Sequence, residues 1–367
     1  FIESNNLDSL KGACIHMPKK LSTIVSGVKD YWGLRRKQPI GQLVTILQKE
    51  GFKCPHVLSS IGEDSAAIDL GGDKLILLST DAVIPELAEN KPYVAGYAAI
   101  LVNVNDIYAA GGRPIVAMVN IAFTKMKAGV KFMEGICEAG RKFRVEVVRG
   151  HTTPHAPTNS VSASMCGTVP RESYISAGGG QPGDALILAI DLEGRISPNY
   201  EFGWDTTTFK SSKDILARYE AMRILADKRL LSASKDLSNG GIIGTTLLML
   251  EYAKKGAIID LSAITIPTNL DLSTWLKMYI STGFVVSTIP KNVDAVIAIF
   301  EEQGLKATKI GKVDKSQKVK VQLEDEIITV FDFQKESIVA PPAPPQLNRI
   351  SNRIAKRQQE EKEPSDK

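Results

Sequence analysis

The segment Gly62-Glu63-Asp64-Ser65-Ala66-Ala67, followed by the apolar run Leu75-Ile76-Leu77-Leu78 that ends in Ser79-Thr80-Asp81, carries most of the information in this chain. The apolar run predicts a buried strand, and open α/β sheets bind ligands at the carboxyl ends of such strands. Acidic side chains at a turn and at a strand end are also the groups that hold Mg²⁺ against nucleotide phosphates. Asp64 and Asp81 are therefore candidate site residues, although Asp81 taken alone could equally cap a helix or a turn.

Strand-like and helical stretches alternate along the chain, which predicts a mixed α/β (α+β) fold. A glycine-rich composition break at residues 177–184 divides this alternation, so we expect two domains. The predicted divisions are a leader over 1–40, an amino-terminal domain over 41–172, a carboxyl-terminal domain over 173–335 and a tail over 336–367. The expected strands are 75–79, 115–123, 145–149, 161–169, 185–190, 258–261, 284–288, 307–313 and 319–322, and the expected helices are 93–110, 130–142, 213–228, 242–255, 270–279 and 293–303.

The composition argues against several classes of function. The 367 residues carry a formal net charge of only +4, without a basic block interleaved with aromatics, so nucleic acid is not an expected partner. The longest apolar stretch, 94–110, is interrupted by Asn103, Asn105 and Asp106, so no membrane span is expected. The amino terminus lacks the pattern of a signal peptide, and the four cysteines lack zinc-site spacing. We therefore expect a cytoplasmic protein.

The tail combines a Pro-rich stretch with a charged, Gln-rich end. Such a composition cannot bury enough apolar area to offset the entropy of ordering, which predicts disorder. Leu347, Ile350 and Ile354 nevertheless have helical spacing, so a helix that docks on a protein partner is the alternative.

The predicted helix 93–110 carries two polar residues on one face. Asn103 and Asp106 are three residues apart and lie among apolar neighbours. A carboxylate in that setting is either a hydrogen-bonded core group or a ligand for metal or phosphate, and the acidic residues that precede it favour the ligand. Gly111-Gly112-Arg113-Pro114 then ends the helix and turns into the next strand.

Two later segments carry further candidates. Arg149-Gly150-His151-Thr152-Thr153-Pro154-His155 follows the strand 145–148 as a predicted turn, in which Gly150 would let the backbone approach a phosphate. The two histidines could also suggest zinc, but Pro154 rules out a helix between them and no third ligand is evident. In Lys235-Asp236-Leu237-Ser238-Asn239-Gly240-Gly241, Asp236 could belong to a substrate or phosphate site, while Ser238 or Asn239 could simply cap the next helix.

The order of these motifs resembles the aminoimidazole-ribonucleotide synthetase superfamily. The set is Gly-Glu-Asp-Ser-Ala-Ala, Ser-Thr-Asp, Asn-x-Asn-Asp-Ile-x-Ala-x-Gly-Gly-x-Pro, Gly-His-Thr, Pro-Gly-Asp at 182–184 and Asp-x-Ser-x-Gly-Gly, and it spans about residues 35–330. That superfamily includes thiamine-monophosphate kinase, selenophosphate synthetase and the hydrogenase maturation dehydratase. The segments 93–107, 204–208 and 275–279 look closest to the uncharacterised branch that contains methanogenesis marker protein 2.

The resemblance implies an amino-terminal domain that dimerises through its β-sheet and binds ATP, and a carboxyl-terminal domain that closes over an acceptor. It implies that Asp64, Asp81 and Asp106 hold Mg²⁺ and the phosphates, with Glu63 and Asn103 in support. Thr80, Gly150 and Thr152 belong to the matching motifs and are the remaining candidates for nucleotide binding.

Departures from the relatives limit what the resemblance transfers. Thiamine-monophosphate kinase would have two aspartates in the first motif and Gly-Gly-Asp-Thr in the fourth, where this chain has Glu63-Asp64 and Gly150-His151-Thr152. The reactive cysteine of selenophosphate synthetase and the terminal cysteine of the hydrogenase maturation enzyme have no counterpart. Neither thiamine phosphate nor these specialised reactions is therefore expected.

The sequence thus predicts an ATP- and Mg²⁺-dependent enzyme, a homodimer, that transfers the γ-phosphoryl group to a small acceptor or activates it. Lys37 or Arg113 could approach the phosphates, and His151 and Asp236 are the candidate catalytic residues. The first alternative is a nucleotide-binding subunit or scaffold of a maturation complex without turnover. The second is a zinc hydrolase built on His151 and His155.

Overall fold

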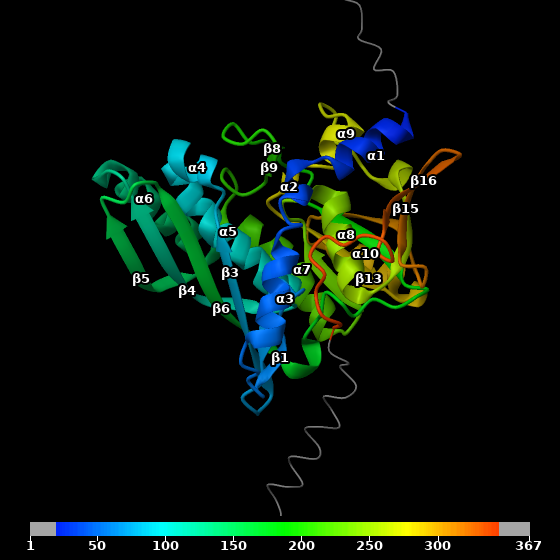
Figure 1. Ribbon diagram of the computed structural model, residues 1–367, viewed down its shortest axis with the longest axis horizontal. Coiled ribbons are helices and arrows are strands. Elements are labelled where there is room, and N and C mark those ends of the chain that lie inside the picture. The colour runs from blue at the N-terminus through cyan, green and yellow to red at the C-terminus, as the bar shows by residue number, and fades with distance from the viewer. Residues whose placement is uncertain (1–19, 345–367) are drawn as a thin grey trace, which may run out of the picture.

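The computed structural model describes residues 20–344, in which helices pack on two separate β-sheets (Figure 1). The fold is mixed α/β with two domains, as the alternating pattern predicts. In the view of Figure 1 the first domain lies on the left, with β5 at its outer edge, and the second lies on the right. No helix in residues 20–344 is both long enough and apolar enough to cross a lipid bilayer.

The first sheet has six strands in the order β1-β2-β3-β6-β4-β5, and all neighbours are antiparallel except β4 and β5. Along β3 the residues Leu75 and Leu77 are fully buried beneath the helices, whereas Leu78 and Thr80 point to the open face. The strands are β1 (Val57–Ser59), β2 (Ala66–Ile68), β3 (Lys74–Ala82), β4 (Arg113–Phe123), β5 (Glu146–Pro154) and β6 (Ser160–Pro170). The helices of this domain are α4 (Pro85–Asn90), α5 (Pro92–Ala109) and α6 (Met126–Phe143).

The second sheet has seven strands in the order β10-β13-β7-β14-β11-β15-β16. Its central strands β7 (Ala185–Ile190) and β13 (Gly283–Thr288) are buried on both faces, because helices cover both sides. The other strands are β10 (Ala233–Asp236), β11 (Gly256–Asp260), β14 (Lys306–Asp314), β15 (Lys318–Leu323) and β16 (Glu326–Asp332). The helices are α7 (Ser212–Asp227), α8 (Gly241–Ala253), α9 (Leu272–Trp275) and α10 (Val293–Glu302), and a small third sheet joins β8 (Arg195–Ile196), β9 (Gly203–Asp205) and β12 (Tyr279–Ile280).

A continuous apolar core joins the two domains. Helix α7 contributes Tyr219, which is fully buried and stacks on Tyr108 of α5 with ring centroids 4.6 Å apart. The Tyr219 ring also packs edge-on against Phe143 of α6 and Phe284 of β13. The helices of the first domain and the sheet of the second therefore meet across a packed, aromatic boundary, which fixes where the two halves of a site would face each other.

The segment that composition assigns to a leader is partly structured. Helix α1 (Leu21–Lys29) buries Leu21, Ile24, Val25 and Val28 against the second domain. Helices α2 (Trp32–Arg35) and α3 (Ile40–Glu50) follow it towards the first domain. Residues 21–29 therefore belong to the core of the second domain, although they come first in the chain, while residues 1–19 lie outside the described part.

The beginning of the predicted tail also packs on the protein. The carboxylate of Glu251 in α8 accepts hydrogen bonds from the backbone N–H groups of Ile338, Val339 and Ala340, and Ile338 is buried. The second domain therefore extends beyond residue 335. The predicted docking helix around Leu347, Ile350 and Ile354 lies outside the described residues.

Two predicted elements are wrong in extent. The helix expected over 270–279 is only the single turn α9, because Tyr279 instead pairs with Gly203 as strand β12. The turn expected after 145–149 is strand, because β5 continues in parallel pairing with β4 as far as Pro154.

Candidate phosphate and metal site

The turn that carries the first acidic motif is fixed by a glycine and by the second domain. Gly62 has a φ of +104°, and a side chain there would meet the ring of Tyr252 at 2.5 Å. The next residue, Glu63, accepts hydrogen bonds from Ser176 Oγ (2.6 Å), the Ala177 N–H (2.7 Å) and Tyr252 Oη (3.0 Å). These donors occupy its carboxylate, so Glu63 attaches the turn to the segment between the domains.

Three aspartates that are far apart in the sequence meet beside this turn. Asp64 follows Glu63, Asp106 lies in α5, and Asp236 ends β10 of the second domain. One carboxylate oxygen from each lies within 4.8 Å of the others. Asp106 is 7% exposed and Asp236 is 3% exposed, and no residue within 20–344 donates a hydrogen bond to either side-chain carboxylate. The group therefore combines high negative charge with unused acceptor oxygens.

One buried lysine partly compensates this charge. Lys235, directly before Asp236, forms an ion pair and a short hydrogen bond with Asp64, which also accepts from the Asp236 N–H at 3.1 Å. Burial alone would lower the pKa of Lys235, but Asp64 and Asp236 raise it, so the ammonium stays charged. Burial and the neighbouring carboxylates raise the pKa of Asp106 and of Asp236 well above the ordinary value.

A second set of charges lies at the rim of this group. Asp81, near the end of β3, is accessible to solvent and lies close enough to Lys37, Lys235 and Arg36 for their charges to act on it. Desolvation by the surrounding protein and the negative charge of Asp64 raise the pKa of Asp81, whereas the positive charge of Lys37 lowers it. Burial and its cationic neighbours lower the pKa of Lys37. Asp81 caps no helix, because α4 begins at Pro85 without a side-chain cap.

The structure gives three predicted residues other partners. Asn103 is fully buried, and its side chain donates to the Ala99 and Ala163 carbonyls and accepts from Ser79 Oγ at 2.8 Å. It therefore ties α5 to the sheet. Thr80 points to the opposite face of β3 from Asp81, where its hydroxyl contacts Ser164. Arg113 pairs with Glu220 at 3.2 Å and lies five residues along the paired strands from the Asp81 row, or about 17 Å.

The predicted fourth motif also lies apart from the aspartates. Gly150, His151 and Thr152 are exposed on β5, the edge strand. His151 is aligned with Ala82 across two intervening strands, which separates them by about 14 Å at the usual strand spacing. Within one chain, His151 is therefore not at the carboxylate group. Within residues 20–344 the aspartates form the only group of three or more metal-ligating side chains, so no third ligand joins His151 and His155.

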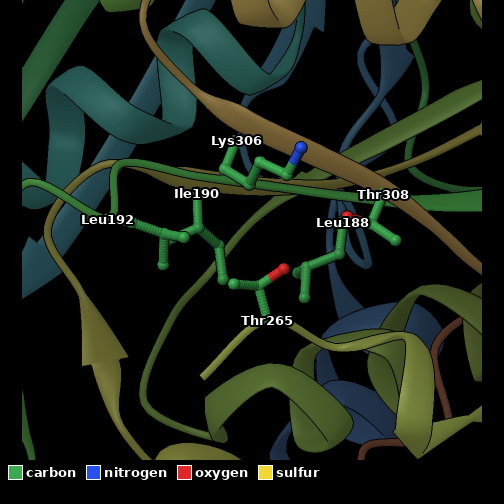
Figure 2. Close-up of a pocket in the computed structure, with 6 residues that line it drawn as sticks. All are labelled: Leu188, Ile190, Leu192, Thr265, Lys306 and Thr308. Carbon is green, nitrogen blue, oxygen red and sulfur yellow. The ribbon is translucent and has the colours of Figure 1, made fainter. Parts of the chain in front are cut away.

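A cavity of about 420 Å³ lies between the first domain and the small third sheet. Its walls come from α4, α5 and the segment 195–208, with Tyr279 and Ser281 closing one side. Tyr279 connects it to the aspartates, because Asn105 Nδ2 donates to Tyr279 Oη at 3.4 Å and burial together with Asp236 raises the Tyr279 pKa. A depression beside Leu188, Ile190 and Lys306 (Figure 2) measures only about 10 Å³, which leaves room for one water at most.

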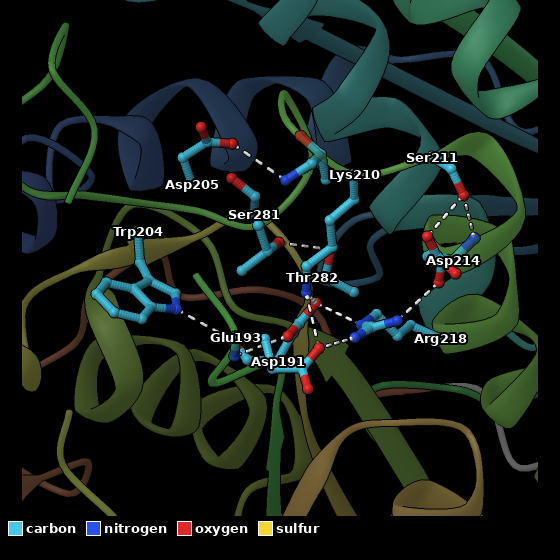
Figure 3. A network of polar contacts seen from close by, with 12 residues as sticks. Asp191, Glu193, Trp204, Asp205, Lys210, Ser211, Asp214, Arg218, Ser281 and Thr282 are labelled. Carbon is cyan, nitrogen blue, oxygen red and sulfur yellow. Dashed lines mark hydrogen bonds and ion pairs between the residues drawn. The ribbon is translucent and has the colours of Figure 1, made fainter. Parts of the chain in front are cut away.

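A buried ionic network holds one wall of the cavity (Figure 3). Asp191, fully buried, contacts both Lys210 Nζ and Arg218 Nε at 2.5 Å. Lys142 of α6 reaches across from the first domain and donates to the carbonyls of Thr207, Thr208 and Lys210. The loop from 205 to 210 is therefore held by both domains, and its position does not depend on a ligand.

Sequence reasoning missed Lys235, Tyr97 and Tyr279 as site residues. Lys235 stands within a motif that we single out for Asp236, and its partner Asp64 is 171 positions away. The signal available was a lysine directly before the aspartate of a glycine-rich motif, since the strand itself, Ala233–Asp236, is not apolar. The tyrosines have no comparable signal, because their role depends only on which segments face each other.

Comparison with known proteins agrees with this architecture. The family model "AIR synthase related protein, N-terminal domain" matches residues 62–169, and "AIR synthase related protein, C-terminal domain" matches 181–324. Uncharacterised proteins of Synechocystis sp. and Methanocaldococcus jannaschii are 36% and 34% identical to this chain, each over 87% of it and 98% of their own length. A selenide, water dikinase of Nitratidesulfovibrio vulgaris is 27% identical over 57% of this chain and 62% of its own.

The solved structures share the fold at low sequence identity. Thermotoga maritima PurL complexed with ATP has a TM-score of 0.64 and 17% identity over 76% of this chain and 46% of its own. The two family models lie on the two domains described above and together cover more than half of the sequence. This chain is therefore a member of the AIR synthase related protein family.

Proposed function

We propose that this protein is an ATP- and Mg²⁺-dependent enzyme that transfers the γ-phosphoryl group of ATP to a small acceptor. The observation that carries the proposal is the convergence of Asp64, Asp106 and Asp236, from both domains, beside a cavity. One relative of this chain is a selenide, water dikinase, and one structure with a similar fold, Thermotoga maritima PurL, is complexed with ATP. Both support a phosphoryl-transfer role. In the reaction an acceptor oxygen bonds to the γ-phosphorus, the bond to the β-phosphate oxygen breaks, and ADP and a proton are released.

The donor set fits Mg²⁺. Three carboxylate oxygens lie within 4.8 Å of one another, and opposite ligands of an octahedral Mg²⁺ are about 4.2 Å apart. Two of the three carboxylates have no hydrogen-bond donor among the described residues, so they retain lone pairs for a cation. Asp64, Asp106 and Asp236 would hold the ion, which would offset the charge of the phosphates. Asp81, predicted as a metal ligand, lies at the rim of this set.

The chain's own cations would position the nucleotide. Lys37 and Arg36 approach Asp81 from the segment before α3, and Lys235 lies among the three aspartates. Together they place positive charge around the carboxylates, where triphosphate oxygens would lie. Tyr279, between the aspartates and the cavity, would separate the phosphates from the body of the acceptor.

We also propose a homodimer in which the open faces of two first sheets meet. On that face Leu78 is 42% exposed and Met118 is 39% exposed, close to Thr80 and Cys166 on β3 and β6. An open apolar sheet face is a common site of association between copies of one chain. Substituting Met118→Arg and measuring sedimentation velocity tests this: a monomer is expected, and an unchanged dimer rejects the face.

The test of function is a calorimetric titration of the full chain with ATP, with and without Mg²⁺. We expect Mg²⁺-dependent binding that Asp236→Asn weakens at least about tenfold, because a charged ligand to the ion is lost. The matched control is Asp325→Asn, an exposed aspartate in the turn between β15 and β16, which should leave binding unchanged. Equal ATP binding in Asp236→Asn would reject the site.

The alternative function is a nucleotide-binding subunit without turnover. It is favoured by one observation: His151, the predicted imidazole base, does not lie at the aspartates within a single chain. Tight Mg²⁺-dependent ATP binding without ADP formation in the presence of any acceptor would support that alternative.

A further inference from the structure

The lining of the cavity indicates what kind of acceptor the enzyme takes, an inference that rests on the proposed function. Most of the surface that lines the cavity is apolar or aromatic. Its apolar residues include Leu87, Val94 and Leu101, and its aromatic residues include Tyr93 and Tyr200. Its volume, about 420 Å³, suits a drug-sized molecule that is largely enclosed. The acceptor must therefore be compatible with a mostly apolar enclosure.

Only two lining residues carry full charges, and they neutralise each other. Arg195 Nε donates to Asp205 Oδ2 at 3.2 Å, and the Arg195 guanidinium stacks on Phe209, 4.7 Å from the ring centroid. Asp205 also accepts from the N–H groups of Thr207 and Thr208 and from the Thr208 hydroxyl. Its acceptor positions are therefore filled from within the protein, and among the described residues that line the cavity neither charged side chain is unpaired.

The two walls meet at a pair of buried hydroxyls. Tyr97 of α5 and Thr207 of the loop held by Lys142 are 4% and 0% exposed, and their hydroxyl oxygens lie close enough to interact with each other. Because both oxygens are buried, neither is open to a ligand in the cavity. This pair therefore offers no hydrogen bond to an acceptor.

We propose that the acceptor is an uncharged, mainly apolar ring compound that packs against the apolar and aromatic lining of this cavity. A phosphorylated or carboxylated acceptor is disfavoured, because its charge would face apolar walls without a free cation. The reacting hydroxyl of the acceptor would then lie at the Tyr279 side, next to the aspartates.

The experiment compares a neutral and a charged probe built on the same ring system, 2-naphthylmethanol and 2-naphthyl phosphate. Each is titrated by calorimetry into the full chain without nucleotide. We expect the neutral probe to bind at least tenfold more tightly than the phosphate. Ala98→Trp, which places a large ring in the cavity, should weaken the neutral probe at least tenfold, whereas Lys127→Trp on the exposed side of α6 should not.

Three outcomes would overturn the proposal: no binding of the neutral probe, equal or tighter binding of the phosphate, or neutral-probe binding unaffected by Ala98→Trp. Mg²⁺·ATP is titrated into the same samples, which reports on the proposed function separately. Retained nucleotide binding with failed probe selectivity rejects only the acceptor class. If the unsubstituted protein does not bind Mg²⁺·ATP, phosphoryl transfer itself is rejected.

Discussion

Replacing Asp106 with asparagine should stabilise the metal-free protein while it weakens Mg²⁺·ATP binding. Asp106 is buried, and its carboxylate lies within 4.8 Å of those of Asp64 and Asp236. The ion pair of Lys235 is with Asp64. The charge of Asp106 is thus repelled by two neighbours and attracted by one, and the side chain of asparagine keeps the shape without the charge.

The magnitude follows from Coulomb's law. Two unit charges 4.8 Å apart at an effective dielectric constant of about 20 interact by about 3.5 kcal/mol. Two repulsions and one attraction leave about one such interaction unfavourable. Protonation limits this cost, because holding a carboxyl with an ordinary pKa near 3.9 protonated at pH 7 costs about 4 kcal/mol. We therefore expect Asp106→Asn to raise the free energy of unfolding by about 3.5 kcal/mol, and by no more than about 4 kcal/mol.

Asp191→Asn is the matched control with the opposite sign. Asp191 is equally buried, but its neighbours are cations, Lys210 and Arg218, each at 2.5 Å. Removing its charge should lower the free energy of unfolding by about 3–5 kcal/mol, because both buried cations lose their buried partner and keep only the exposed carboxylate of Glu193. Urea unfolding of both variants without metal, followed by calorimetry with Mg²⁺·ATP, measures both effects. If Asp106→Asn destabilises the metal-free protein as Asp191→Asn does, the reasoning about crowded carboxylates is wrong.

Three further outcomes follow from the same geometry. Lys37→Ala should weaken Mg²⁺·ATP binding about tenfold, whereas Arg113→Ala should leave it unchanged, since Arg113 pairs with Glu220 at the far end of the sheet; equal losses in a calorimetric titration would contradict this. Glu251→Gln should lower the thermal midpoint by weakening three hydrogen bonds to residues 338–340, and should increase cleavage there by a protease; an unchanged cleavage rate would count against the anchoring. The raised pKa values of the aspartates mean that the folded, metal-free protein binds protons that the unfolded chain releases, so its stability should fall as pH rises above about 4 towards those pKa values. Added Mg²⁺ should therefore raise the thermal midpoint more at pH 7.5 than at pH 5.5, and an equal rise at both would refute the linkage.

The sequence predicts the regular parts of the fold because local patterns determine them. The apolar run of β3 and the long apolar helix from Pro92 to Ala109 are visible in the chain itself. Asp64 stands out in an acidic turn, and Asp106 stands out as a charge in an apolar segment. Strand alternation also places Thr80 and Asp81 on opposite faces, a signal that was available from the period of two.

Other features depend on contacts between distant segments. The helix predicted over 270–279 fails because Tyr279 pairs with Gly203, and no local pattern reveals that pairing. The sequence does not reveal the full length of β5, because this edge strand exposes both faces and therefore lacks the alternation of apolar and polar residues. Arg113 lies next to a conspicuous glycine turn, yet the turn is at the wrong end of the strand for the site. Such positions follow from sheet register, which a single sequence does not determine.

Glu63 and Asp64 are consecutive residues whose carboxylates leave the chain in different directions and end on different parts of the second half of the protein. One accepts from the Ser176–Ala177 junction between the domains, and the other from Lys235 and Asp236. A single planar peptide unit therefore joins the contact at the domain junction to the carboxylate group. A cation that displaces the Asp64 carboxylate is expected to shift the Ser176–Ala177 junction as well, so a spectroscopic label at the junction should report ligand arrival without touching the ligand.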